Sequence, residues 1–138
     1  MSIVVWDGNS LAVDRSCTDG VTVWEVDKLW EFNGEAITGV GDMAALTLMR
    51  DWYMAGAMRA EFRPVPSRTT LIVVNVDKGL VKYEASPDRV EHGRNKCAFG
   101  TGRAYAMGAM AMGATARQAA IVAAEFDPHC STKLDMFP

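Results

Sequence analysis

The chain has 138 residues, of which 49% are hydrophobic and 22% are charged, and its formal net charge is -3. A chain of this length and composition is expected to form one globular domain, residues 1–138, whose core needs neither disulfides nor a structural metal ion. Because the net charge is slightly negative and the Lys and Arg residues are scattered, we expect no nucleic-acid partner.

The first forty residues alternate short apolar runs with turn-forming residues, which predicts antiparallel strands. Strands are expected at residues 2–6, 11–16, 21–26, 28–32 and 35–40. The turns between them are predicted at Asp7-Gly8-Asn9, Thr18-Asp19-Gly20 and Asn33-Gly34. Within the second run, Asp14 is an acid among apolar residues, and its place there needs an explanation.

The middle of the chain predicts one helix followed by two strands. Asp42 is a good N-cap, and the apolar residues from Met43 to about Arg59 follow helical spacing. Residues 69–76 are the clearest strand, because their consecutive apolar residues are typical of a strand buried on both faces. Residues 80–84 are its expected hairpin partner, and residues 85–95 are expected to form a polar loop.

The last third of the chain predicts a brief strand at residues 97–99, a small-residue helix at 104–112 and a final amphipathic helix. Thr115 and Gln118 form a capping box that opens the final helix, which runs to about Phe126. Residues 133–137 are expected to close the chain as an edge strand. The order of these elements predicts an α+β fold, a four-layer αββα sandwich of two antiparallel sheets with helices outside.

Ser2 is the first candidate for chemistry. If Met1 is removed, which a small following residue permits, Ser2 carries a hydroxyl and a free α-amine on one residue. The α-amine has a reference pKa of roughly 8, so part of it is unprotonated near neutral pH and can accept the hydroxyl proton. The plain alternative is a structural N-terminal serine, since many cytosolic proteins begin with Met-Ser.

The Cys and His residues predict no metal site or cofactor. Cys17, Cys97 and Cys130 lack Cys-x-x-Cys spacing, which favours reduced thiols, and His92 and His129 lie far apart. The N-terminal apolar run is too short for a signal peptide, and the stretch 104–116 is too short to span a bilayer. We therefore expect a cytoplasmic protein without a membrane segment.

Taken together, these landmarks resemble the proteasome β subunits and, more closely, the HslV-type peptidases and their short phage relatives. These proteins are N-terminal nucleophile hydrolases with the αββα fold. The resemblance covers nearly the whole chain. It rests on Ser2 after the initiator Met, Ala12-Val13-Asp14-Arg15, Val26-Asp27-Lys28-Leu29, Gly39-Val40-Gly41-Asp42, Ala98-Phe99-Gly100-Thr101-Gly102, and Asp127 after the final helix.

The resemblance implies a catalytic group around Ser2. Lys28 would hold its ammonium near Ser2, lower the pKa of the amine and help the hydroxyl lose its proton, and Asp14 would pair with Lys28. The backbone amide of Gly41 would stabilise the oxyanion. The alternatives are a surface lysine on a strand edge, an aspartate on the exposed face of a sheet, and a glycine needed only by the turn.

Two further residues would support the amine. Thr101 would hydrogen-bond the amine or a shuttling water, and its alternative is the N-cap of the small-residue helix. Asp127 would orient Thr101 or the amine, and its alternative is a helix-ending residue before Pro128. Cys130 stands where the resembled pattern has a supporting Ser, and we expect it to be structural.

The resemblance also implies partners: a peptide or unfolded polypeptide substrate, a homo-oligomeric ring and an ATPase unfoldase. Two departures favour a catalytically inactive scaffold as the alternative function. Cys130-Ser131-Thr132 replaces the expected Ser and glycines, and residues 60–68 replace a long second helix. A retained Met1 would likewise favour the scaffold, because it would block the amine of Ser2.

Two other motifs suggest competing chemistry. Residues 39–44 fit Gly-x-Gly-x-x-Ala, a dinucleotide-binding pattern, but antiparallel hairpins precede it and no second parallel strand follows. Cys130 with His92 or His129 would make a nucleophilic pair, although nothing in the local sequence supports it and buried cysteines are usually inert.

Overall fold

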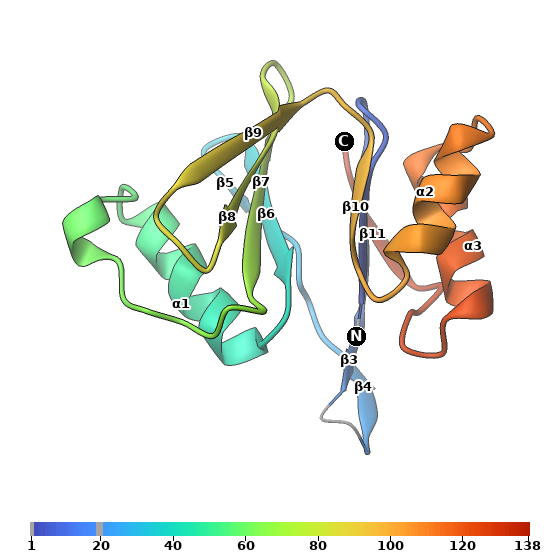
Figure 1. Cartoon of the computed structure of the whole chain (residues 1–138), viewed down its shortest axis with the longest axis horizontal. Coiled ribbons are helices and arrows are strands. Elements are labelled where there is room, and N and C mark those ends of the chain that lie inside the picture. Colours follow the sequence, from blue (N-terminus) through green and yellow to red (C-terminus); the bar gives the residue numbers. More distant parts are fainter. Residues whose placement is uncertain (1, 19–20) are drawn as a thin grey trace.

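The computed structural model describes residues 2–18 and 21–138, so Met1 and two predicted turn residues, Asp19 and Gly20, lie outside the described residues. Figure 1 shows four layers in the order helix, sheet, sheet, helix pair. The helices are α1 (Met43–Met54) on one side and α2 (Arg103–Ala111) and α3 (Ala116–Phe126) on the other. The αββα sandwich predicted from the sequence is confirmed.

Two sheets form the middle layers, and every pairing between their described strands is antiparallel. The first sheet has the order β10 (Cys97–Gly100), β1 (Ile3–Trp6), β2 (Leu11–Asp14), β11 (Leu134–Phe137). The second has the order β5 (Trp30–Phe32), β6 (Glu35–Val40), β7 (Thr70–Asn75), β8 (Gly79–Glu84), β9 (Arg89–Gly93). A separate hairpin joins β3 (Ser16–Thr18) and β4 (Val23–Glu25).

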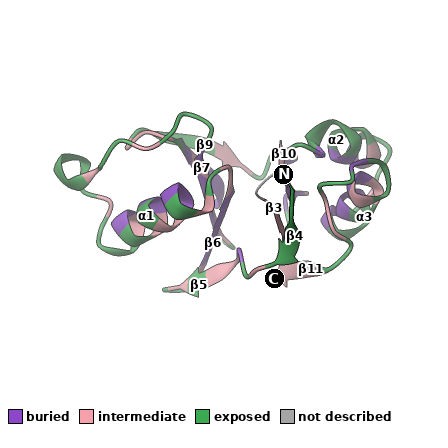
Figure 2. Ribbon diagram, turned by 90° about the horizontal axis from the view of Figure 1, so that it is seen from below, coloured by how far each residue is buried: buried purple, intermediate pink, exposed green. Residues whose placement is uncertain are grey.

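Strand β1 lies at the centre of the packing because both of its faces are buried. Ile3 and Val5 contact the core under α2 and α3, whereas Val4 and Trp6 contact the core between the two sheets. A third core joins α1 to the outer face of the five-stranded sheet. Figure 2 shows the buried residues gathered on the facing sides of these layers. Since side chains alternate along a strand, Ser2 continues the row of Val4 and Trp6 toward the space between the sheets.

Local sequence signals placed most elements correctly. Asn33-Gly34 connects β5 and β6, and Asp42 caps α1 by accepting a hydrogen bond of 2.9 Å from the amide of Ala45. The capping box at α3 is present, with Thr115 and Gln118 satisfying each other's backbone amides. Residues 133–137 supply the edge strand β11, which pairs with β2.

Two predicted elements were wrong. Helix α1 ends at Met54 and not near Arg59, because the chain turns back and the amide of Ala57 donates to the carbonyl of Trp52 at 3.0 Å. The predicted polar loop at residues 85–95 contains β9, which pairs with β8 at the edge of the sheet. Charged residues such as Arg89 and Glu91 are common on edge strands, where they discourage pairing with other chains.

Candidate active site

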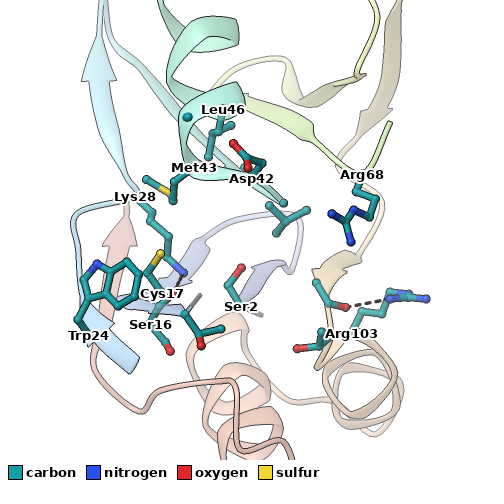
Figure 3. A pocket seen from close by; sticks show the side chains of 17 residues that line it. Ser2, Ser16, Cys17, Trp24, Lys28, Asp42, Met43, Leu46, Arg68 and Arg103 are labelled. Carbon is teal, nitrogen blue, oxygen red and sulfur yellow. Dashed lines mark hydrogen bonds between the residues drawn. The ribbon is translucent and has the colours of Figure 1, made fainter. Parts of the chain in front are cut away.

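The N-terminus, the β3–β4 hairpin and the β10–α2 turn meet at one end of the sandwich (Figure 1). A pocket of about 840 Å³ opens there between the two sheets. Ser2, Lys28, Gly41 and Thr101 line it. Figure 3 shows Ser2 and Lys28 among the lining side chains. These four residues come from segments far apart in the sequence, so the fold alone brings them together.

Ser2 lies at the base of this pocket, directly before β1. It is buried, and the close approach of the β10–α2 turn holds its backbone. A Cβ atom added to Gly100 would lie 2.0 Å from the carbonyl oxygen of Ser2, and the φ of Gly100 is 106°. Only glycine fits this position. The glycine that opens the Gly-Thr-Gly turn therefore sets the distance between that turn and Ser2.

Asp14 and Lys28 form a buried ion pair next to Ser2. The Nζ of Lys28 lies 2.8 Å from Oδ1 of Asp14, and the two side chains are 3% and 0% exposed. Lys28 also donates to the carbonyl of Ser16, and Asp14 accepts from the amide of Ile3 at 3.1 Å. The pair is thus linked to the residue that follows Ser2. These positions exclude the surface alternatives for both residues.

Gly41 lies between β6 and α1 and lines the pocket. Its φ is 110°, and an added Cβ would lie 2.4 Å from the carbonyl oxygen of Arg68. The turn therefore requires glycine for a structural reason, whatever its amide does. The following residues open α1, whose positive N-terminal dipole end lies beside the pocket and favours negative charge there.

We expect Gly41→Ala to lower the free energy of unfolding by roughly 1–3 kcal/mol, because the left-handed conformation and the contact with Arg68 both disfavour a side chain. Urea unfolding followed by circular dichroism measures this. Gly108→Ala is the matched control: nothing lies within 4 Å of its added Cβ, and it is exposed within α2. That change should stabilise the protein by about 0.5–1 kcal/mol. Equal midpoints for Gly41→Ala and the wild type would contradict the expectation.

Thr101 and Asp127 also contact each other. Burial tends to raise the pKa of Asp127, but hydrogen bonds from the Thr101 hydroxyl, the His129 amide and the Cys130 thiol outweigh burial and lower it. Asp127 therefore carries a negative charge beneath Thr101. The N-cap of α2 is Gly102, without a side-chain hydrogen bond, so Thr101 does not have the capping role given as its alternative.

Cys130 belongs to the same hydrogen-bonded group. Burial, together with the charges of Asp127 and Asp14, raises the pKa of its thiol to about 12. Because the thiolate is the nucleophilic form, Cys130 is a poor nucleophile near neutral pH. This disfavours the cysteine-histidine pair and agrees with a structural thiol.

The structure adds contacts that sequence reasoning missed. The carbonyl of Ser16 accepts from Lys28, and the amide of Ser131 donates to Oδ2 of Asp14 at 3.1 Å. Both are backbone groups, so no pattern of side chains in the sequence predicts these contacts. Arg68 and Arg103 also line the pocket. For Arg103, the sequence offered one indication of this place: it directly follows Gly-Thr-Gly and opens α2.

Other chemistry finds little support in the described residues. The Gly-x-Gly-x-x-Ala motif joins an antiparallel strand to α1, so the parallel unit that dinucleotide binding requires is not formed around it. Across residues 2–18 and 21–138, no three His, Cys, Asp or Glu side chains are grouped in a way that could hold a metal ion. No helix in the described part of the chain is both long and apolar enough to cross a membrane.

The fold is similar to two solved structures. Eukaryotic HslV from Trypanosoma brucei aligns with a TM-score of 0.70 and 20% identity, over 99% of this chain and 97% of that chain. BPH from Thiobacillus denitrificans, solved in complex with epoxomicin, aligns with a TM-score of 0.72 and 18% identity over the same shares. No protein-family model and no curated protein sequence matches the chain. At these identities the likeness concerns the fold, which is that of HslV.

Proposed function

Starting from the fold of HslV and the groups around Ser2, we propose that this chain is an N-terminal serine hydrolase that cleaves peptide bonds after removal of Met1. The observation that carries the proposal is the buried Asp14–Lys28 pair at the base of the pocket, hydrogen-bonded to the residue next to Ser2. A buried ion pair is costly to desolvate, and a hydrophobic pair would often serve stability as well. Its place beside a candidate nucleophile favours a chemical role.

In the proposed reaction, the Ser2 hydroxyl attacks the carbonyl carbon of the scissile peptide while the α-amine of Ser2 accepts its proton. The Lys28 ammonium favours loss of that proton, and the Gly41 amide donates to the oxyanion of the tetrahedral intermediate. The amine then protonates the leaving nitrogen, which breaks the peptide bond and leaves an ester on Ser2. Water, activated by the same amine, hydrolyses the ester and restores the hydroxyl.

The partners follow from the same proposal. The substrate is a peptide or unfolded polypeptide, and the chain assembles into a homo-oligomeric ring. An ATPase unfoldase would deliver folded substrates. The segment between α1 and β7 contains only the short helical turn η1 (Arg59–Glu61), so these contacts need a different surface from one built on a long second helix.

The intact mass of the purified protein tests the proposal. The sample is measured alone and after exposure to epoxomicin, the ligand in the similar BPH structure. We expect loss of Met1 and one adduct that peptide mapping assigns to Ser2. Ser2→Ala and urea-unfolded wild type are the controls, and neither should be labelled.

A second candidate is a catalytically inactive scaffold, favoured by Cys130-Ser131-Thr132 and by the short connection between α1 and β7. The same experiment separates the two. A retained Met1, or a free Ser2 that stays unmodified in the folded protein, would contradict the enzyme and support the scaffold.

A further inference from the structure

The pocket has two chemically different walls. Figure 3 shows Trp24 and Lys28 on one side of Ser2, and Arg68 and Arg103 on the other. The ammonium of Lys28 is already neutralised by Asp14, whereas both arginines are exposed. One wall therefore offers an aromatic surface and the opposite wall offers two guanidinium groups.

The backbone holds both arginines close to the proposed reaction centre. The carbonyl of Arg68 packs against Gly41, where an added Cβ would lie 2.4 Å from it. Arg103 follows the turn whose Gly100 abuts the carbonyl of Ser2. The two side chains thus begin beside the candidate oxyanion amide and beside the candidate nucleophile, from segments that are otherwise unrelated.

Neither guanidinium is neutralised by a carboxylate within 4.0 Å in the described part of the chain. Arg103 donates from Nη1 to the carbonyl of Gly100 at 3.0 Å, which uses one of its five N–H donors. Asp42 is the one carboxylate among the described lining residues, and its Oδ1 already accepts from Ala45 as the cap of α1. The pocket therefore keeps donors available for an anionic ligand.

The position of Arg103 is unfavourable for the helix that it opens. A cation in the first turn opposes the helix dipole, and an exposed side chain gains little from packing that could offset this. An anion bound at this place would remove the conflict, because the helix N-terminus and the guanidinium would then attract the same charge.

We propose that Arg68 and Arg103 together bind a carboxylate of the peptide substrate, so that the pocket selects acidic peptides. The inference rests on the proposed function, because it names the substrate class of the same site. Two sources supply this group: the side chain of Asp or Glu, and the free C-terminus of a peptide. The aromatic wall around Trp24 would meet the apolar part of the same ligand.

Turnover of matched peptides is the first test. Acetylated, amidated peptides carry a single Glu or Gln at successive positions, and a third set has Gln with a free C-terminal carboxylate. Mass spectrometry gives kcat/KM. We expect peptides of one carboxylate set to have a higher kcat/KM than the amidated Gln peptides. Arg68→Gln or Arg103→Gln should lower the ratio of these two kcat/KM values by roughly three- to fivefold. Arg117→Gln is the control, because Arg117 is an exposed arginine in the first turn of α3 and does not line the pocket.

Binding to Ser2→Ala protein separates this inference from the proposed function. The dissociation constants of the same peptides should favour the carboxylate, and the double variant Arg68→Gln/Arg103→Gln should remove the preference. If no peptide is cleaved but this preference is present, the hydrolase proposal fails and the carboxylate site stands. If Glu, free-acid and amidated Gln peptides behave alike in both measurements, or if the preference survives in the double variant, the inference is overturned.

Discussion

Replacing Lys28 with methionine is expected to lower kcat/KM for peptide hydrolysis by roughly 10²–10⁴-fold, the range that a positioned group for proton transfer contributes. Methionine keeps much of the length of the side chain but removes the ammonium that lies 2.8 Å from Asp14. Without that charge, the deprotonated amine and hydroxyl of Ser2 lose the ammonium that we propose stabilises them. Initial rates on a cleaved peptide measure the effect.

The same change also disturbs the fold, because it leaves the carboxylate of Asp14 buried without its cation. It should lower the free energy of unfolding by ~3 kcal/mol. The double variant Asp14→Leu/Lys28→Met separates the two effects, since a pair of apolar side chains removes the uncompensated charge. Stability should recover in part and hydrolysis should not. Recovery of both would contradict a chemical role for Lys28 and leave the pair as a structural device.

The sequence predicted the elements whose signals are local. Asn33-Gly34, the Asp42 cap and the Thr115 capping box act within a few residues of their own positions, so their effects follow from chemistry that the sequence displays directly. Strand β9 was missed because it is an edge strand whose exposed charges resemble those of a loop. The end of α1 was missed because the apolar spacing continues beyond Met54, while the backbone turns at Ala57.

The residues of the site also fall into those that the sequence indicated and those that only the folded structure brings together. An acid within an apolar strand is unusual, which singled out Asp14 in the sequence, and in the structure Asp14 is fully buried against Lys28. The choice of Lys28 as that partner depended on a resemblance, since no spacing rule links a residue on β2 to one in the connection between β4 and β5. The carbonyl of Ser16, the amide of Ser131 and the side chain of Arg68 reach the site only through tertiary packing. No pattern of residues in the sequence predicts that these three groups lie at the site.

Asp14→Ala is expected to lower the free energy of unfolding by about 3–5 kcal/mol, because it leaves the buried ammonium of Lys28, the buried amide of Ile3 and the half-buried amide of Ser131 without their acceptor. Urea unfolding measures this. Asp135→Ala on the neighbouring strand β11 is the matched control: Asp135 pairs with Arg15 at 3.1 Å, but both side chains are about one-third exposed. A pair of that kind contributes about 0–1 kcal/mol.

Comparing Asp14→Ala with Asp135→Ala shows how the stability lost with an ion pair depends on whether the pair is buried. Asp14 and Asp135 lie on neighbouring strands and each pairs with one cation, so a large difference between the two variants reports the burial of the first pair together with the amides that Asp14 accepts from. Equal losses would mean that water reaches Lys28 and that its ammonium is well solvated. In that case the field at Ser2 would be weak, because an opposite or like charge acts strongly on a neighbouring group only where the local dielectric is low. The stability of Asp14→Ala therefore bears on the proposed chemistry as well as on the fold.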